Sequence, residues 1–146
     1  MNWELVSAVA GVLGVVGGLV SVIFLILEVR RNALAIEGAT VQSLMSFEHA
    51  VYALIAANAK IYLAGLEDRE ALAPENRLKF DMVVQSYMSL FYSAFTQHEQ
   101  GLIDPDVWVA YTNAVHKRME SPGFVASWSL SCTSYPERFQ AFVRTA

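Results

Sequence analysis

The segment from Leu5 to Leu27 holds twenty-three consecutive residues without a charged side chain. As an α-helix it is about 34 Å long, which is enough to cross a hydrocarbon core of roughly 30 Å. Helices in the core of a soluble protein seldom run this long without a charge. We therefore predict one membrane-spanning helix with its flanks in residues 1–31, followed by a soluble domain in residues 32–146.

The flanking residues favour a membrane span over a cleaved signal peptide. Trp3 suits the headgroup layer, and the Lys or Arg residues nearest the segment are Arg30 and Arg31, after its end. The positive-inside rule then places the N-terminus outside and residues 32–146 in the cytoplasm. The stretch 33–35 imitates a cleavage site, but no Lys or Arg precedes the apolar run, and two arginines intervene before it. A buried core helix is the other alternative.

Small residues form one face of the predicted span. They recur mainly at three- and four-residue spacings, and the members expected to pack are Ala10, Gly11, Gly14, Gly18 and Ser21. Small side chains let two helix backbones approach closely, which favours helix association in lipid. The alternative is that glycine and alanine are common in membrane helices. Asp, Glu, Lys, Arg and His are absent from the span, which argues against a proton relay, an ion path or a haem ligand there.

The composition excludes several classes of protein. The formal net charge is -4 and the pI is near 5.3, whereas a nucleic-acid binder normally presents a basic face. A single cysteine, Cys132, rules out an intramolecular disulfide and a zinc site built from several cysteines. A lone thiol also fits a reducing compartment.

The residues after Arg31 predict an all-α fold, an antiparallel bundle of three to five helices. The ends of the helices are indicated by Pro74, Gly101, Asp104-Pro105 and the Ser121-Pro122-Gly123 break. The expected helices run from 32 to about 65, from 74 to 101, from 105 to 120, from 124 to 130 and from 136 to 143. In the first of them the predicted core-facing residues are Val41, Met45, Tyr52, Ile55, Ala59 and Tyr62. Leu44, Phe47, Val51 and Leu54 widen that stripe.

Motifs for catalysis are missing from the sequence. The histidines at 49, 98 and 116 belong to no HExxH or Glu-x-x-His pattern, and Cys132 has no identifiable base. No G-x-S-x-G, G-x-G-x-x-G or P-loop sequence occurs. We therefore expect no enzymatic activity, no cofactor and no metal site. The aromatic residues are numerous enough to supply an interface, and His98, Trp108 and Trp128 are the candidate ligand or interface contacts.

The chain resembles an uncharacterised family of small bacterial single-pass inner-membrane proteins. The resemblance rests on the opening residues 1–4, on the span running into residues 28–32, and on the stretch 97–104 with Trp108 four residues on. It implies a helical cytoplasmic domain below an inner-membrane anchor. It carries over no activity and no functional residue.

Two functions are expected from these observations. The first is a non-enzymatic accessory or assembly subunit that self-associates or joins a larger inner-membrane complex, whether respiratory, photosynthetic or transport. The alternative is a membrane-tethered sensor or binding module whose bundle holds a small apolar ligand beside His98. The expected partners are membrane lipid and other membrane-protein subunits or a second copy of the chain, with no nucleic acid.

Overall fold

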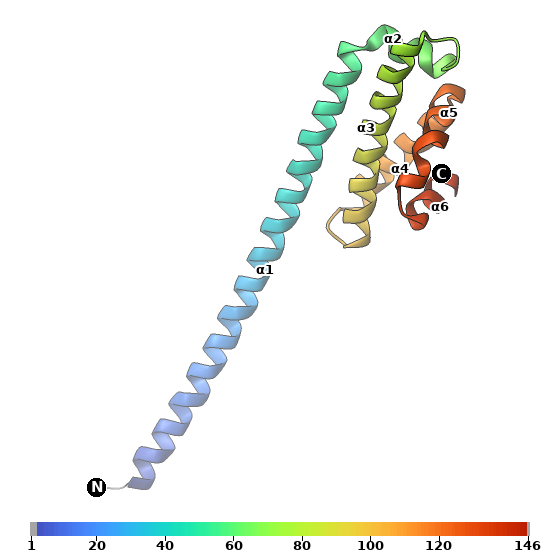
Figure 1. Ribbon diagram of the computed structural model, residues 1–146. Coiled ribbons are helices and arrows are strands. Elements are labelled where there is room, and N and C mark those ends of the chain that lie inside the picture. The colour runs from blue at the N-terminus through green and yellow to red at the C-terminus, as the bar shows by residue number, and fades with distance from the viewer. Residues whose placement is uncertain (1–2, 146) are drawn as a thin grey trace. The chain divides into compact units, whose positions relative to one another are not determined.

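The computed structural model describes residues 3–145, with side chains described for residue 11 and residues 13–145. Every regular element in this range is helical, and none of these residues forms a strand (Figure 1). The helices are α1 (Trp3–Ala57), α2 (Ala59–Glu67), α3 (Pro74–Glu99), α4 (Pro105–Met119), α5 (Pro122–Ser131), the short 3-10 helix η1 (Cys132–Ser134) and α6 (Glu137–Thr145). The prediction of an all-α chain is confirmed.

Contacts divide the chain into two compact units, Met1–Gly38 and Ala39–Ala146. Helix α1 begins in the first unit and ends in the second. The boundary between these units follows Gly38, and the boundary between span and soluble domain expected after Arg31 stays a prediction.

The first unit is helical, and its described side chains, at residue 11 and residues 13–38, are exposed. Leu19 is 59% exposed and Phe24 is 66% exposed, and the other large apolar residues described there are similarly open. Among the described residues, α1 is the one helix long and apolar enough to cross a membrane. Burial inside this chain therefore does not explain its hydrophobicity.

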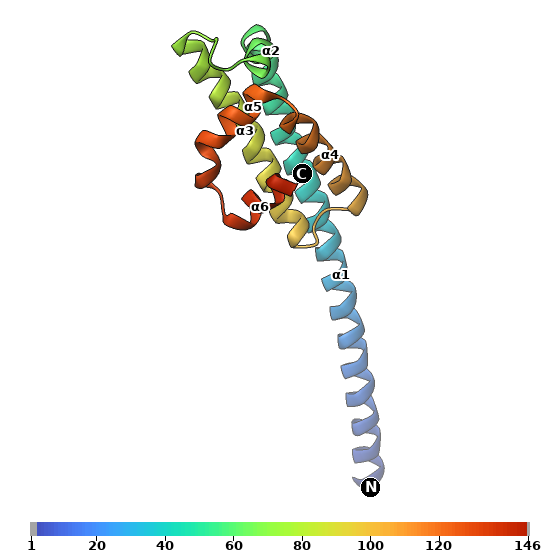
Figure 2. The same ribbon diagram turned by 90° about the vertical axis from the view of Figure 1, so that its right-hand side faces the viewer.

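The second unit packs around α3, which lies beside α2, α4 and α5 (Figure 2). The face of α3 that carries Phe80, Val84, Tyr87, Phe91 and Phe95 is buried, as its spacing predicts. The other helices and the connection between α3 and α4 add buried residues to the same core: Leu44, Val51, Tyr62, Ile103, Val115, Phe124, Trp128, Phe139 and Val143. The second unit thus has a single hydrophobic core.

Two glycines allow α2 and α5 to approach closely. A Cβ atom at Gly123 would overlap the backbone carbonyl of Gly65, and a Cβ atom at Gly65 would overlap the ring of Phe80. Both glycines are buried. Any larger residue at Gly123 would have to push two backbones apart, so this crossing fixes where α5 lies.

The loop between α2 and α3 is held by an ion pair. The Arg69 guanidinium donates from Nε and Nη2 to the two carboxylate oxygens of Asp81 on α3, both at 2.7 Å. The Arg69 side chain is only 10% exposed. Burial raises the pKa of Asp81, but the hydrogen bonds from Arg69 and Ser127, together with the positive charges of Arg69 and Arg77, leave this pKa below its ordinary value.

Several predicted helix ends are confirmed. Helix α3 begins at Pro74, Gly101 follows it with φ +70°, and the Asp104 side chain accepts a hydrogen bond from the Asp106 backbone N–H at the start of α4. Helix α5 (Pro122–Ser131) extends one or two residues beyond its predicted bounds at each end, and α6 (Glu137–Thr145) begins one residue later and ends two residues later than predicted.

The predicted extent of the first soluble helix was wrong. A continuous helix to about residue 65 was expected, but α1 ends at Ala57 and α2 begins at Ala59. At the break, the Asn58 side chain donates to the Leu54 carbonyl, and a side-chain hydrogen bond of this kind competes with helical hydrogen bonding.

The predicted core stripe was partly wrong. Leu44, Val51 and Tyr62 are buried as predicted. Met45 is 53% exposed and Tyr52 is 46% exposed, contrary to the prediction. Apolar residues cover more than half of this helix, so their spacing did not single out the buried face.

Candidate functional site

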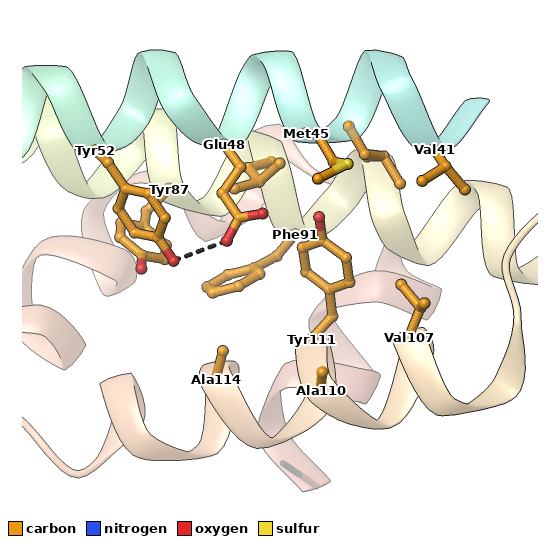
Figure 3. Close-up of a pocket in the computed structure, with 12 residues that line it drawn as sticks. Val41, Met45, Glu48, Tyr52, Tyr87, Phe91, Val107, Ala110, Tyr111 and Ala114 are labelled. Carbon is orange, nitrogen blue, oxygen red and sulfur yellow. Dashed lines mark hydrogen bonds between the residues drawn. The ribbon is translucent and has the colours of Figure 1, made fainter. Parts of the chain in front are cut away.

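The second unit contains a pocket of about 400 Å³ between the last part of α1, α3 and α4 (Figure 3). This volume falls within the range of roughly 300–1,000 Å³ typical of small-molecule sites. Its lining residues are Val41, Leu44, Met45, Glu48, Tyr52, Tyr87, Leu90, Phe91, Val107, Ala110, Tyr111 and Ala114. Because Met45, Tyr52 and Val107 are partly exposed, the pocket is open to solvent.

The pocket exists because small residues of α4 face larger ones of α1 and α3. Ala110 and Ala114 are one helical turn apart and both belong to the lining. In Figure 3 their short side chains leave the space opposite Glu48 and Phe91 unfilled. The second unit is therefore tightly packed at the Gly65–Gly123 crossing and open between α1, α3 and α4.

Glu48 is the only charged residue in the pocket lining. The hydroxyl of Tyr52 donates a hydrogen bond of 2.8 Å to its carboxylate, from one turn further along α1 (Figure 3). No described residue forms an ion pair with Glu48 within 4.0 Å. A carboxylate in apolar surroundings is stabilised by pairing with a positive charge, so this group is an attractive contact for a ligand.

Tyr111 brings a second hydroxyl into the pocket from α4. Burial, followed by the nearby negative charge and hydrogen-bonding oxygen of Glu48, raises the pKa of Tyr111 to about 12. The phenol is therefore neutral near neutral pH and remains a hydrogen-bond donor. Glu48, Tyr52 and Tyr111 form the polar end of an otherwise apolar site.

Arg118 supports the pocket from outside its lining. Its Nη2 donates to the Tyr87 hydroxyl at 2.8 Å, and its guanidinium carbon lies 4.8 Å from the centre of that ring. Burial by itself lowers the pKa of Arg118, but the hydrogen bond with Tyr87 and the neighbouring tyrosines raise it overall. The guanidinium thus stays charged and holds one wall of the pocket in place.

The three residues singled out as ligand or interface contacts lie away from this pocket. His98 and Trp108 stack with ring centres 4.3 Å apart and planes 4° from parallel, and both are half-buried. Trp128 lies in the core, 5% exposed, against Tyr135 and Phe139. The structure therefore brings His98 and Trp108 together and places Trp128 separately.

The predicted small-residue face is uncovered where the structure describes it. A Cβ atom at Gly11, Gly14 or Gly18 would meet nothing within 4 Å. The Ser21 hydroxyl donates to the Gly17 carbonyl at 2.8 Å within the helix. The side chain of Ala10 lies outside the described residues.

Sequence reasoning missed the pocket. It singled out neither Glu48 nor Tyr111. The available signal was the pair Ala110 and Ala114, which puts two short side chains on one face of a helix beside an aromatic ring.

Across residues 3–145 as described, no group of three or more His, Cys, Asp or Glu residues is placed to hold a metal ion. Comparison with protein-family models, with curated proteins and with solved structures found no match.

Proposed function

We propose that the protein is a non-enzymatic, membrane-anchored interaction protein that self-associates or serves as an accessory or assembly subunit of a larger membrane complex. The observation that carries this proposal is the uncovered apolar helix of the first unit, on which one face is open at Gly11, Gly14 and Gly18. Lipid covers large apolar side chains well, whereas a face without side chains packs best against another helix.

In this proposal residues 5–27 cross a bacterial inner membrane once. The N-terminus lies outside, and the second unit lies in the cytoplasm as an antiparallel bundle of helices. Arg30 and Arg31 directly follow the apolar stretch, which supports this orientation through the positive-inside rule.

The test is the mass of the particle extracted gently from its native membrane, compared with the mass of 16.2 kDa for one chain. A multiple of this mass, or a larger particle containing other polypeptides, supports the proposal. A bare monomer contradicts it. The variant Gly14→Ile/Gly18→Ile is expected to reduce the particle mass, because bulky side chains prevent close helix approach. Val16→Leu/Val20→Leu adds bulk to the opposite face and is the matched control.

A second candidate function is a membrane-tethered binding module or sensor, favoured by the pocket of about 400 Å³. Its apolar walls and its few polar groups gathered at one end are typical of small-molecule sites. This pocket takes the place of the site expected beside His98, which is not among its lining residues.

An uncharged apolar probe, neopentylbenzene, tests the binding role. Saturable shifts of the Met45 methyl signal are expected when the probe is added to the full chain in lipid nanodiscs. Ala110→Leu/Ala114→Leu fills the pocket and should abolish the shifts, whereas Ala141→Leu, at an exposed position of α6, should leave them unchanged. Shifts that do not saturate, or that survive the filling variant, contradict the proposal.

A further inference from the structure

We propose that the pocket between α1, α3 and α4 selects a small hydrophobic cation, a quaternary or protonated organic amine whose charged nitrogen lies beside Glu48. The proposal rests on the binding role of the pocket proposed above and names the class of ligand. Three features carry it: the single charge in the lining, the aromatic rings around that charge, and the apolar remainder of the walls.

The charge of Glu48 has no partner of opposite sign within the lining. The carboxylate is half-buried, and its described hydrogen bond comes from the neutral hydroxyl of Tyr52. A cation entering the pocket would gain an ion pair in surroundings of lower dielectric constant than water. An anion entering the same site would meet Glu48 and no positive lining residue.

Aromatic rings surround the same end of the pocket. The side chains of Tyr52, Phe91 and Tyr111 lie around Glu48 in Figure 3. The faces of such rings attract organic cations, and rings gathered around a carboxylate are a recurring arrangement for ammonium groups. Tyr87 already carries the guanidinium of Arg118 at 4.8 Å, so the other three rings are the ones assigned to the ligand.

The rest of the pocket accommodates an apolar tail. Val41, Leu44, Val107 and Ala110 offer no hydrogen-bonding side chain. A sugar or a nucleotide would lose the hydration of its polar groups there without replacement, at a cost in free energy. The ligand therefore combines one positive charge with a compact hydrocarbon body.

Two probes of the same shape separate the effect of charge on binding affinity from the effect of shape. Benzyltrimethylammonium and neopentylbenzene differ in one atom, a positively charged nitrogen in place of a carbon. Titration calorimetry of each into the full chain in lipid nanodiscs, corrected with empty nanodiscs, gives the two affinities. We expect the cation to bind roughly tenfold more tightly, which corresponds to about 1.4 kcal/mol.

The variant Glu48→Gln keeps the shape of the side chain and removes its charge. It should weaken binding of benzyltrimethylammonium roughly tenfold and leave neopentylbenzene unchanged. Glu67→Gln, at an exposed position of α2, is the matched control and should change neither affinity. Tyr111→Leu removes an aromatic face and should weaken the cation more than Tyr111→Phe does.

The outcomes are distinguishable. Equal affinity for the two probes, or a Glu48→Gln variant that binds the cation normally, overturns the cation assignment and leaves the binding role standing. If neither probe binds, both the assignment and the binding role are contradicted. Circular dichroism of each variant is the folding control. Unchanged helix content shows that a loss of binding comes from the altered pocket and not from unfolding.

Discussion

Residues 13–29 of α1 and helix α3 are both rich in large apolar side chains, yet they have opposite surroundings. In α3, polar and charged positions interrupt the apolar ones, and the apolar face is buried, with Phe80 and Val84 fully inaccessible. In α1 almost every position of this stretch is apolar, and its side chains remain about half to two-thirds exposed. A helix with one apolar face is stabilised by a protein core, whereas a helix apolar all round needs lipid or another helix.

The largest effect is expected when charged side chains are placed on the exposed part of α1. Leu19→Arg/Ile23→Arg should oppose membrane insertion by about 5–7 kcal/mol, since each arginine near the middle of a span costs about 2.5–3.5 kcal/mol. Flotation with liposomes should show the variant losing membrane association. Leu19→Ala/Ile23→Ala is the control that should still float. Continued flotation of the arginine variant would mean that these positions do not lie in the hydrocarbon core.

Replacing glycine by alanine should have different effects on stability at two positions, Gly123 and Gly38. Gly123→Ala should destabilise the second unit by about 3 kcal/mol, because the new Cβ atom would overlap the Gly65 carbonyl. Gly38→Ala should be neutral or slightly stabilising, since nothing lies within 4 Å and alanine favours a helix. Urea unfolding followed by circular dichroism measures both. Equal effects at the two positions would contradict the close crossing of α2 and α5.

The next largest effect on stability is expected when the Arg69–Asp81 ion pair is broken. Arg69→Ala should cost about 2–3 kcal/mol, because it leaves a partly buried carboxylate without its partner. The same urea experiment measures the loss. Lys79→Ala removes an exposed pair with Glu75 and should cost well under 1 kcal/mol, and a similar cost for both would refute the role assigned to Arg69.

Acidic pH should remove the stabilisation that the Arg69–Asp81 ion pair provides. Because the pKa of Asp81 is lower in the folded chain than in the unfolded one, its stabilisation is present above about pH 4 and is lost as the pH falls through the folded value. Asp81→Asn should therefore be less stable at neutral pH and lose less stability on acidification. Unfolding free energies at pH 7 and pH 3 test this, and parallel pH profiles for the two proteins would contradict it.

The smallest expected effect is a change in the stability of the second unit at alkaline pH. The pKa of Tyr111 is raised from 10.0 to about 12, so the unfolded chain releases this proton first. Its contribution to stability is full below pH 10 and declines as the pH rises toward 12. Tyr111→Phe should flatten this part of the stability profile slightly. An unchanged slope would show that Glu48 and burial do not act on this phenol.

Local signals explain which parts of the fold were predictable. Pro74, Gly101, Asp104 and Pro122 restrict the backbone or cap a helix whatever their surroundings, and the helix ends they indicate are present. The break at Asn58 has no glycine or proline, and it was missed.

The positions of the buried face and the pocket depend on packing that sequence spacing does not determine. Met45 and Tyr52 fit the helical spacing of core residues, but they line an opening. The surroundings of Glu48 also depend on packing, because Phe91 comes from α3 and Tyr111 from α4. The small-residue face, by contrast, was apparent from spacing alone, and its role in assembly stays a prediction.

We propose that residues 5–27 lie within a lipid bilayer, and alkaline carbonate extraction of membranes containing the full chain is the first test of this proposal. Carbonate releases proteins held at a membrane surface by other proteins and leaves inserted helices in the pellet. We expect the chain to remain in the pellet and the Leu19→Arg/Ile23→Arg variant to appear in the supernatant. Release of the unmodified chain into the supernatant would contradict the account, because another protein and not lipid would then cover this helix.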